Sequence, residues 1–343
     1  MRLLLTGGYG FIGTNFIKYL IDIDSKIEVL NIDKLTYASS TDGLDNILTK
    51  KNLKYKFHQS DIANYNEMVS IINSFQPTCL INFAAESHVD RSINHHNEFI
   101  ETNIVGTYSL LSASYNYIKL GGKLSKFIHV STDEVFGSLR ENDSPFTEIS
   151  PYNPSSPYSA SKASSDHLVK SWHKTFNFPS IITNCSNNYG PYQFPEKLIP
   201  LIIINSLNDE KLPIYGDGRN IRDWLFVKDH CSALFSILNH GNIGESYNIG
   251  GNNEVRNIDI VNKICDILDK IKPKENGKKY KDQIEFVDDR PGHDYRYAID
   301  STKIKNDLNW KPQENFNSGL LRTVEWYVNN SEWWNDLRND IEK

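Results

Sequence analysis

The sequence has few cysteines, and no two of them are close together. The four are Cys79, Cys185, Cys231 and Cys265. Their spacing argues against a disulfide framework and against a cysteine-ligated zinc site. Other metal ligands do not gather either: His95 and His96 are adjacent, which on a helix points them about 100° apart, and Asp288-Asp289 has no further ligand nearby. We therefore expect free thiols, no metal and a cytoplasmic location.

Excess positive charge and long apolar runs are also missing. The 37 basic and 43 acidic residues give a net charge of -6, which argues against a nucleic-acid or anionic-membrane partner. The longest apolar candidate, Leu198–Ile204, is interrupted by Pro200 and is far short of the ~18 residues that a membrane span needs. The apolar start Met1–Leu5 stops at Thr6, too soon for a signal peptide. We expect no nucleic-acid partner and no membrane partner.

What the first half does contain is a regular alternation of apolar runs and helical patterns. The expected strands are Leu3–Thr6, Glu28–Ile32, Tyr55–Gln59, Cys79–Phe83, Lys126–Ser131 and Ser180–Asn184. The expected helices are Phe11–Ile21, Glu67–Phe75, Asn97–Lys119 and Ser156–Asn177. Continuous apolar strands alternating with helices predict an α/β fold, a Rossmann-type doubly wound parallel sheet covered on both faces.

The regular alternation of strands and helices ends at about Asn187, after which loops become longer and richer in Gly, Pro and Asn. Expected helices are Pro195–Leu207, Lys228–Asn239, Ile258–Lys270 and Asn317–Val328. Expected strands are Leu212–Tyr215, Ser246–Ile249 and Ile284–Val287, and Lys272–Asp282 is expected to be a surface loop. We expect one domain at 1–186 and a smaller mixed α/β lobe over most of 187–343, covering the carboxyl edge of the sheet. Crossing of the chain between the lobes stays open.

A glycine-rich turn follows the first strand and opens a helix. Its sequence is Gly7-Gly8-Tyr9-Gly10-Phe11-Ile12-Gly13. The glycines let the backbone approach a pyrophosphate, and the helix N-terminus offers free N–H groups to it. Asp33 ends the second strand and suits a ribose 2′-hydroxyl, which favours NAD over NADP. The positive charge of Lys34 argues against this preference. Asp61-Ile62, after the third strand, is a candidate cap for the adenine.

Two further patterns carry acid–base chemistry. Ser156 and Pro157 are expected to cap a helix on which Tyr158 and Lys162, four residues apart, share one face. A neighbouring ammonium lowers the pKa of a phenol and makes a phenolate available as a base. The pattern is weak alone, because any helix can contain it.

The fifth strand leads into Thr132-Asp133-Glu134 at the sheet edge where ligands bind. A dry site would push the pKa values of the two carboxyl groups apart, leaving one as an acid and one as a base. The alternative is that this pair caps the following turn or faces solvent.

These patterns together resemble a known family. The chain is similar, from Met1 to about Asn330, to extended short-chain dehydrogenases/reductases, and among them to the dTDP-glucose 4,6-dehydratases. The resemblance is carried by Thr6–Gly13, Ala84–Ser92, Ser131–Gly137, Tyr158–Lys162, Cys185–Pro191, Arg222–Trp224 and Arg290–Asp294. The Asp133-Glu134 pair separates dehydratases from epimerases and reductases of this fold.

The resemblance implies an NAD-dependent hydro-lyase that makes a 4-keto-6-deoxy sugar nucleotide, with a role in deoxysugar biosynthesis such as rhamnose biosynthesis. Tyr158, supported by Lys162 and with Thr132 bonded to the sugar, would take the O4 proton as hydride leaves C4 for NAD. Glu134 would remove the C5 hydrogen and Asp133 would protonate the departing C6 hydroxyl. Hydride would then return to C6, so NAD remains bound.

The resemblance also implies binding residues. NAD contacts are expected at Gly7, Gly10, Phe11, Ile12, Gly13, Asp33, Lys34, Asp61, Ile62, Ala84, Ala85, Tyr158 and Lys162. Sugar and diphosphate contacts are expected at Ser87, Thr132, Asn187, Lys197, Leu198, Arg222, Asn257 and Arg290, and base or ribose contacts at Pro213, Tyr215 and His293. The family also implies a homodimer built on the helices at Asn97–Lys119 and Ser156–Asn177.

Two alternatives are weighed against this prediction. One is a sugar-nucleotide 4-epimerase, against which Asp133 and Glu134 argue. The other is a non-catalytic NAD-sensing module, against which the Tyr158/Lys162 pair argues. The nucleotide stays open, because thymidine and uridine differ by one ring methyl, worth about 1–3 kcal/mol in a pocket. dTDP-glucose is the default substrate and UDP-glucose the alternative.

Overall fold

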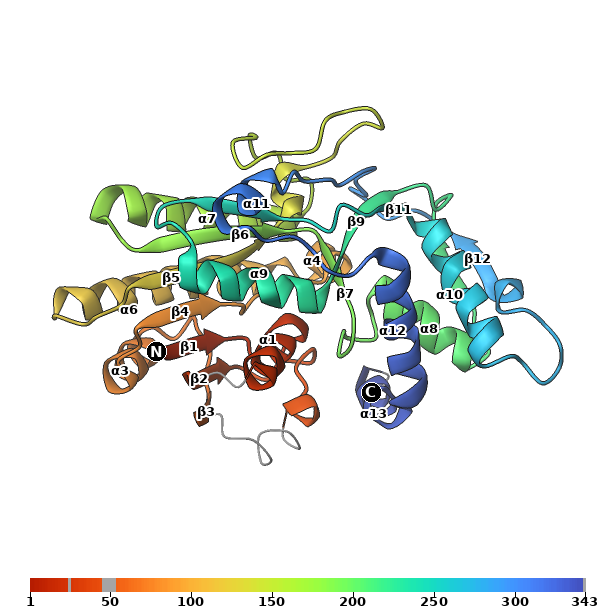
Figure 1. The fold of residues 1–343 in the computed structure, drawn as a ribbon, viewed down its shortest axis with the longest axis horizontal. Helices are drawn as coiled ribbons and strands as arrows, with labels where there is room; N and C mark the ends of the chain where they lie inside the picture. Colours follow the sequence, from red (N-terminus) through yellow and green to blue (C-terminus); the bar gives the residue numbers. More distant parts are fainter. Residues whose placement is uncertain (24–25, 45–53, 342–343) are drawn as a thin grey trace.

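A seven-stranded parallel sheet forms the centre of the larger lobe (Figure 1). The computed structural model describes residues 1–23, 26–44 and 54–341. The strand order is β10-β6-β5-β4-β1-β2-β3, and each neighbouring pair is parallel. The strands are β1 Arg2–Thr6, β2 Glu28–Asp33, β3 Lys54–Gln59, β4 Cys79–Asn82, β5 Lys126–Thr132, β6 Ser180–Cys185 and β10 Ser246–Ile249. The predicted Rossmann-type sheet is confirmed.

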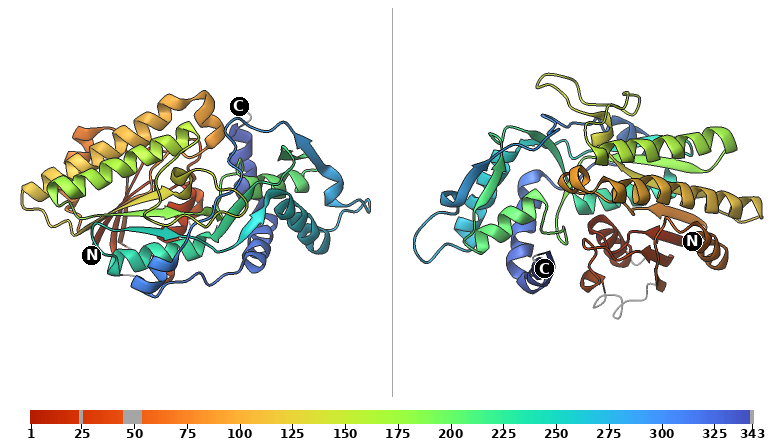
Figure 2. Two further views of the ribbon diagram at one scale, coloured as in Figure 1. Left: turned by 90° about the horizontal axis from the view of Figure 1, so that it is seen from above. Right: turned by 180° about the vertical axis from the view of Figure 1, so that it is seen from behind.

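Helices cover both faces of this sheet, because successive side chains of each buried strand point to opposite faces. On β1, Leu3 and Leu5 pack with one helical layer, whereas Leu4 packs with the other. Helices α1 Phe11–Asp22, α9 Val227–His240 and α11 Thr302–Leu308 cover the first face, and α3 Tyr65–Phe75, α6 Thr107–Lys119 and α7 Pro157–Phe176 cover the second. Figure 2 shows α6 and α7 side by side.

The smaller lobe has its own core and lies beyond the carboxyl ends of the strands (Figure 1). Its sheets are β11-β9-β7 and β12-β8. The strands are β7 Asn187–Tyr189, β8 Leu212–Tyr215, β9 Ile221–Phe226, β11 Glu254–Arg256 and β12 Ile284–Val287. The helices are α8 Leu198–Leu207, α10 Asn257–Ile271, α12 Phe316–Asn329 and α13 Ser331–Ile341. Strand β10 and helix α9 return to the larger lobe, the crossing that the sequence left open.

The sequence patterns located most long elements to within a few residues, and also the short strands β8, β10 and β12, but missed other short elements. β7, β9 and β11 were not predicted, because they are short or interrupted by polar residues. The single helix expected over Asn97–Lys119 is instead α5 His96–Phe99, a π-helical segment η1 Ile100–Gly106, and α6. The predicted loop Lys272–Asp282 ends in a short 3₁₀ turn, η3 Tyr280–Gln283. Among the described residues, no helix is long and apolar enough to cross a membrane.

Candidate active site

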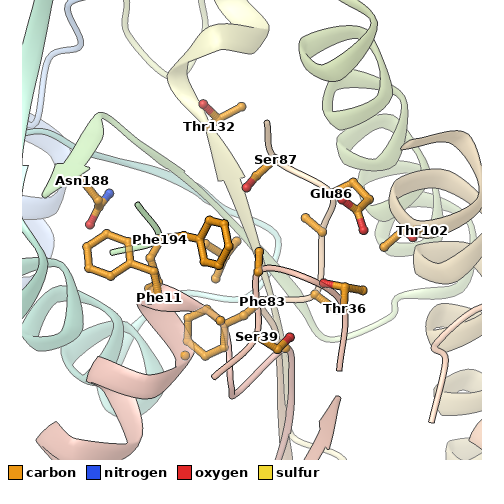
Figure 3. Close-up of a pocket in the computed structure, with 18 of the residues that line it drawn as sticks. Phe11, Thr36, Ser39, Phe83, Glu86, Ser87, Thr102, Thr132, Asn188 and Phe194 are labelled. Carbon is orange, nitrogen blue, oxygen red and sulfur yellow. The ribbon is translucent and has the colours of Figure 1, made fainter. Parts of the chain in front are cut away.

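A cavity of about 300 Å³ opens at the carboxyl ends of the central strands, between the two lobes. In Figure 3, Thr132 and Ser87 lie toward one end of the cavity, and Phe83 and Ser39 lie toward the other. Predicted site residues that line it are Gly7, Gly10, Phe11, Ile12, Gly13, Asp33, Lys34, Asp61, Ile62, Ala84, Ala85, Ser87, Thr132, Asp133, Glu134, Tyr158, Lys162, Asn187 and Lys197. The fold therefore gathers the glycine turn and both acid–base patterns around one space.

The glycine turn leaves room for a ligand at the start of α1. Gly7 has a φ of +71°, and a Cβ there would lie 2.7 Å from the Ala84 nitrogen. A Cβ on Gly13 would overlap the Gly7 carbonyl oxygen. Helix α1 begins at Gly10 with no side-chain cap and no acidic residue in its first turn among the described residues. Its first N–H groups thus face the cavity as a binding site for an anion.

Asp33 ends β2 at the cavity wall, as predicted. Its carboxylate accepts hydrogen bonds from the backbone nitrogens of Tyr9 and Leu35, both at 2.9 Å, and from the Ser39 hydroxyl at 3.1 Å. Lys34, the contrary sign for NAD, lies with its ammonium 2.7 Å from Asp61. Because that charge is paired, Lys34 does not by itself favour a 2′-phosphate.

Tyr158 and Lys162 lie on the first turns of α7. Ser156 accepts a hydrogen bond from the Ser159 nitrogen and Pro157 occupies the first turn, so the predicted cap is confirmed. The Lys162 ammonium donates to the Val130 carbonyl at 2.9 Å. We expected Lys162 to lower the pKa of Tyr158. Burial, with the charge of Glu134 second, raises the pKa of the phenol well above its ordinary value, and the lowering expected from Lys162 together with a cationic nicotinamide ring stays a prediction.

Asn103 supports this catalytic helix and was not predicted. It is fully buried on the π-helical segment η1. Its side chain accepts from the Glu86 nitrogen at 2.9 Å and donates to the Glu86 carbonyl at 3.0 Å and to the Ser161 hydroxyl at 2.8 Å. The π-helical segment thereby joins the loop after β4 to the helix that carries Tyr158.

Thr132 caps a short 3₁₀ turn that carries the two carboxyl groups. Its hydroxyl accepts from the Glu134 nitrogen at 3.2 Å and donates to Asp133 at 3.3 Å. Asp133 is 2% exposed, and its Oδ2 has no hydrogen-bond partner among the described residues. The turn is therefore capped by Thr132, while Asp133 and Glu134 line the cavity.

Charges around the pair differ for its two members. Burial, then the charge of Glu134, raises the pKa of Asp133 well above its usual range. Burial also raises the pKa of Glu134, but the nearby cations Arg290, Arg222 and Lys197 oppose that rise. Burial thus raises the pKa of both carboxyl groups, and the cations oppose the rise only at Glu134, a difference of the kind that an acid–base pair requires.

Of the cationic residues predicted to contact substrate, Lys197 lines the cavity, whereas Arg222 and Arg290 do not. Lys197 donates to the Ser87 carbonyl at 3.0 Å. The Arg290 guanidinium pairs with Asp90 at 2.9 Å, and the Tyr215 hydroxyl donates to the same carboxylate at 3.2 Å. The rings of Tyr215 and His293 lie 6.1 Å apart. Arg290 and Tyr215 thus meet at Asp90, and His293, which pairs with Asp289, joins them through the Tyr215 ring. None of these three predicted contacts is a lining residue of the cavity.

The remaining predicted contacts lie outside the cavity lining. Arg222 on β9 is 5% exposed and donates to the backbone carbonyls of Ile221, Tyr295 and Asp294. Leu198 begins α8, Pro213 lies on β8, and Asn257 begins α10. The Asn257 Oδ1 is buried and unpartnered within the described residues.

The cavity also has lining residues that sequence reasoning missed. Thr36 and Ser39 lie in the loop after Asp33, and Glu86 and Thr102 come from the segments that flank Ser87 and Asn103. Phe194 and Glu196 come from the second half. Proximity to Asp33 and to the Ala84–Ser92 motif could have indicated the loop residues, but no local pattern marks Phe194 or Glu196.

Comparisons with known proteins agree with this site. Residues 4–323 match the family model described as GDP-mannose 4,6 dehydratase, which gives the class of protein. A relative from Escherichia coli strain K12, named dTDP-glucose 4,6-dehydratase 1, is 52% identical over 99% of this chain and 96% of its own length. A relative from Sinorhizobium fredii, named probable dTDP-glucose 4,6-dehydratase, is 51% identical over 99% and 97%. The chain belongs to the dTDP-glucose 4,6-dehydratase family.

A solved structure has the same fold. The dTDP-glucose 4,6-dehydratase from Bacillus anthracis, in complex with NAD, has a TM-score of 0.86 and 44% sequence identity, with 98% of this chain and 99% of that chain covered. The agreement extends over both lobes of this chain.

Proposed function

We propose that this protein is an NAD-dependent dTDP-glucose 4,6-dehydratase, which converts dTDP-glucose to its 4-keto-6-deoxy product and water. The observation that carries the proposal is the Asp133-Glu134 pair, buried at Asp133 and half-buried at Glu134, which faces the same cavity as the glycine turn and Tyr158. A reaction that only oxidises and reduces C4 needs one acid–base group, whereas elimination across C5 and C6 needs a base and an acid in addition.

The residues of the glycine turn fit a dinucleotide. The uncapped start of α1 and the glycines suit the pyrophosphate, and the carboxylate of Asp33 suits the ribose hydroxyls. The Lys34–Asp61 pair removes the charge that would attract a 2′-phosphate. When bound, NAD supplies the acceptor and later the donor of the hydride exchanged with the sugar.

The acid–base roles follow from the charges of the site. Tyr158 takes the O4 proton; its raised pKa must fall for this, and both Lys162 and a cationic nicotinamide ring in the cavity favour the phenolate. Glu134, kept ionised by the surrounding cations, removes the C5 proton made acidic by the 4-ketone. Asp133, kept protonated by burial, gives its proton to the departing C6 hydroxyl.

The substrate contacts extend this proposal into the smaller lobe. Ser87, Thr132, Asn187, Lys197 and Leu198 would contact the sugar and diphosphate. Arg222, Asn257 and Arg290 would hold the phosphates, and Pro213, Tyr215 and His293 would hold the base and ribose. The meeting of Arg290 and Tyr215 at Asp90, with the His293 ring next to Tyr215, supports a single nucleotide subsite.

Steady-state assays with dTDP-glucose and UDP-glucose test the function directly. The 4-keto product absorbs in the ultraviolet in alkali, and we expect it to form faster from dTDP-glucose. Conversion of UDP-glucose to UDP-galactose, without a keto product, would instead identify a 4-epimerase. Bound NAD with neither reaction would identify the non-catalytic module.

We also propose that the protein is a homodimer through α6 and α7. Tyr108 is 48% and Phe176 41% exposed on these helices, and their rings continue through Trp172 and Tyr115 as one row of contacts. An exposed aromatic row that runs over two neighbouring helices suits a symmetric helical interface between two copies of the chain.

We further propose that the protein is located in a reducing, cytoplasmic compartment. Its four free, buried thiols support this location, and cell fractionation tests it.

A further inference from the structure

The loop after β2, residues 34–44, forms part of the wall of the cavity. It follows Asp33 directly, and Thr36, Ala38 and Ser39 line the cavity. The Ser39 hydroxyl donates to the Asp33 carboxylate at 3.1 Å. Any movement of this loop, which we call the β2 loop, therefore disturbs the carboxylate proposed to bind the ribose.

The second half of the chain holds the β2 loop through Tyr37. The Tyr37 hydroxyl donates to Glu196 at 3.0 Å, and its ring contacts Phe194 edge-on at 5.4 Å between centroids. Phe194 lines the cavity, as do Thr36 and Ser39 from the loop (Figure 3). Tyr37 thus joins the wall contributed by the larger lobe to the wall contributed by the segment before α8.

Two further contacts hold the same loop. The Trp333 indole of α13 donates to the Ser40 hydroxyl at 3.1 Å. Gly43 packs so closely on the Tyr192 ring that a Cβ would lie 3.0 Å from it. Both partners, like Glu196, come from the second half of the chain. The β2 loop is therefore attached to that half at Tyr37, Ser40 and Gly43, by residues 192–196 and by α13.

A cation completes the contact at Tyr37. The Arg91 guanidinium, from α4 Val89–Asn94, lies 3.7 Å from the centroid of the Tyr37 ring. Glu196, which accepts from Tyr37, also lies 3.6 Å from the Nε2 of His88. Tyr37 is consequently held from two sides, by a carboxylate and by a cation, in a half-buried position where such contacts are stronger than in water.

We infer that Tyr37 is a positioning residue that keeps the dinucleotide in its cavity, by fastening the β2 loop to Glu196 across the boundary between the lobes. The inference rests on the proposed function, in which one NAD must stay bound through oxidation and reduction. The loop forms part of the cavity wall, so we expect the contacts that hold it to act mainly on the dissociation rate of a bound dinucleotide.

Tyr37→Phe tests this role, because it removes the bond to Glu196 and keeps the ring. Holoenzyme is mixed with excess deuterium-labelled NAD, and the exchange of bound NAD is followed by mass spectrometry after rapid desalting. We expect exchange about 5- to 10-fold faster than in the wild type, as for loss of one partly exposed bond to a charged group. Both kcat at saturating NAD and the melting temperature should stay unchanged.

Two variants complete the experiment. Tyr65→Phe is the matched control, since it removes an exposed hydroxyl that bonds Asn116 far along α6, and its exchange rate should equal the wild type. Ser40→Ala removes the Trp333 contact and should also speed exchange. Wild-type exchange rates in both Tyr37→Phe and Ser40→Ala, with dehydration intact, would overturn this inference but not the proposed function. A wild-type chain that binds no NAD would contradict the proposed function as well.

Discussion

At the scale of single residues, the site contains polar groups whose burial lowers the stability of the folded protein. Asp133 is a carboxyl group with 2% exposure and an unpartnered oxygen among the described residues. A buried polar atom without a hydrogen bond costs about 1–3 kcal/mol. A chain under selection for stability alone would not keep such an atom, which agrees with the proposed role of Asp133 toward a substrate hydroxyl.

Replacing Asp133 by Asn is therefore expected to stabilise the protein while abolishing most activity. The folded-state pKa of Asp133 lies above its unfolded value, so the ionisation penalty is absent below the unfolded pKa and grows as the pH rises through the folded pKa. Thermal melts should show Asp133→Asn more stable by about 1–2 kcal/mol at pH 8, with the difference shrinking toward pH 4. A variant less stable than the wild type at pH 8 would contradict this account.

The cations near Glu134 predict a change in pH dependence. Arg290 opposes the raised pKa of Glu134, so Arg290→Gln should raise that pKa further. Glu134 must be ionised to act, and activity is lost as the pH falls through its folded pKa. The acid limb of the kcat/KM profile should thus move to higher pH, by about half to one unit.

Arg219→Gln is the control for that measurement. Arg219 is exposed and pairs with Asp217 at 3.2 Å, so its removal should leave the acid limb unchanged. If Arg290→Gln lowers kcat/KM equally at every pH, Arg290 binds substrate without tuning Glu134.

At the scale of elements, the tight packing of the glycine turn sets what it tolerates. A Cβ on Gly13 would overlap the Gly7 carbonyl, whereas a Cβ on Gly10 would lie 3.3 Å from the same atom. We expect Gly13→Ala to lose bound NAD and about 1–3 kcal/mol of stability. Gly10→Ala should keep the fold. The ratio of absorbance at 260 and 280 nm after purification, together with thermal melts, distinguishes them; equal NAD content in both variants would refute the prediction.

Elements with a strong local signal could be predicted from the sequence, and elements fixed by distant contacts could not. Apolar runs located β1 and β2, and Ser156-Pro157 located the start of α7. The interruption of the helix at Ile100–Gly106 has no such signal, because a π-helical segment keeps helical periodicity. It is fixed by Asn103, whose partners Glu86 and Ser161 are distant in sequence. π-Helical segments often mark functional sites.

At the scale of the whole molecule, the cavity exists only because two halves of the chain meet. The glycine turn, Thr132–Glu134 and Tyr158 could be recognised because each is a compact pattern in sequence. The site roles of Arg222 and Arg290 were predicted only from the family resemblance, since nothing in their local sequence indicates that they bind a ligand. Phe194 and Glu196 were missed for the same reason: their role depends on contacts with a loop about 160 residues earlier.

The proposed homodimer gives a prediction at this scale. Tyr108→Glu places a charge in the exposed aromatic row of α6 and α7, where burying it against a second copy would be unfavourable. Light scattering at micromolar concentration should give about 79 kDa for the wild type, twice the chain mass of 39.4 kDa, and a monomer for the variant. Tyr65→Glu, on α3, is the control and should remain a dimer. A monomeric wild type would refute the proposal.

The central claim, that Asp133 and Glu134 direct this fold to dehydration, is tested most directly by the reaction in heavy water. Removal and return of the C5 proton should place one solvent deuterium at C5 of the 4-keto-6-deoxy product, detected by NMR and mass spectrometry. Glu134→Gln should form that product about 10²- to 10⁴-fold more slowly. Product without deuterium at C5, or an unchanged rate in Glu134→Gln, would contradict the account.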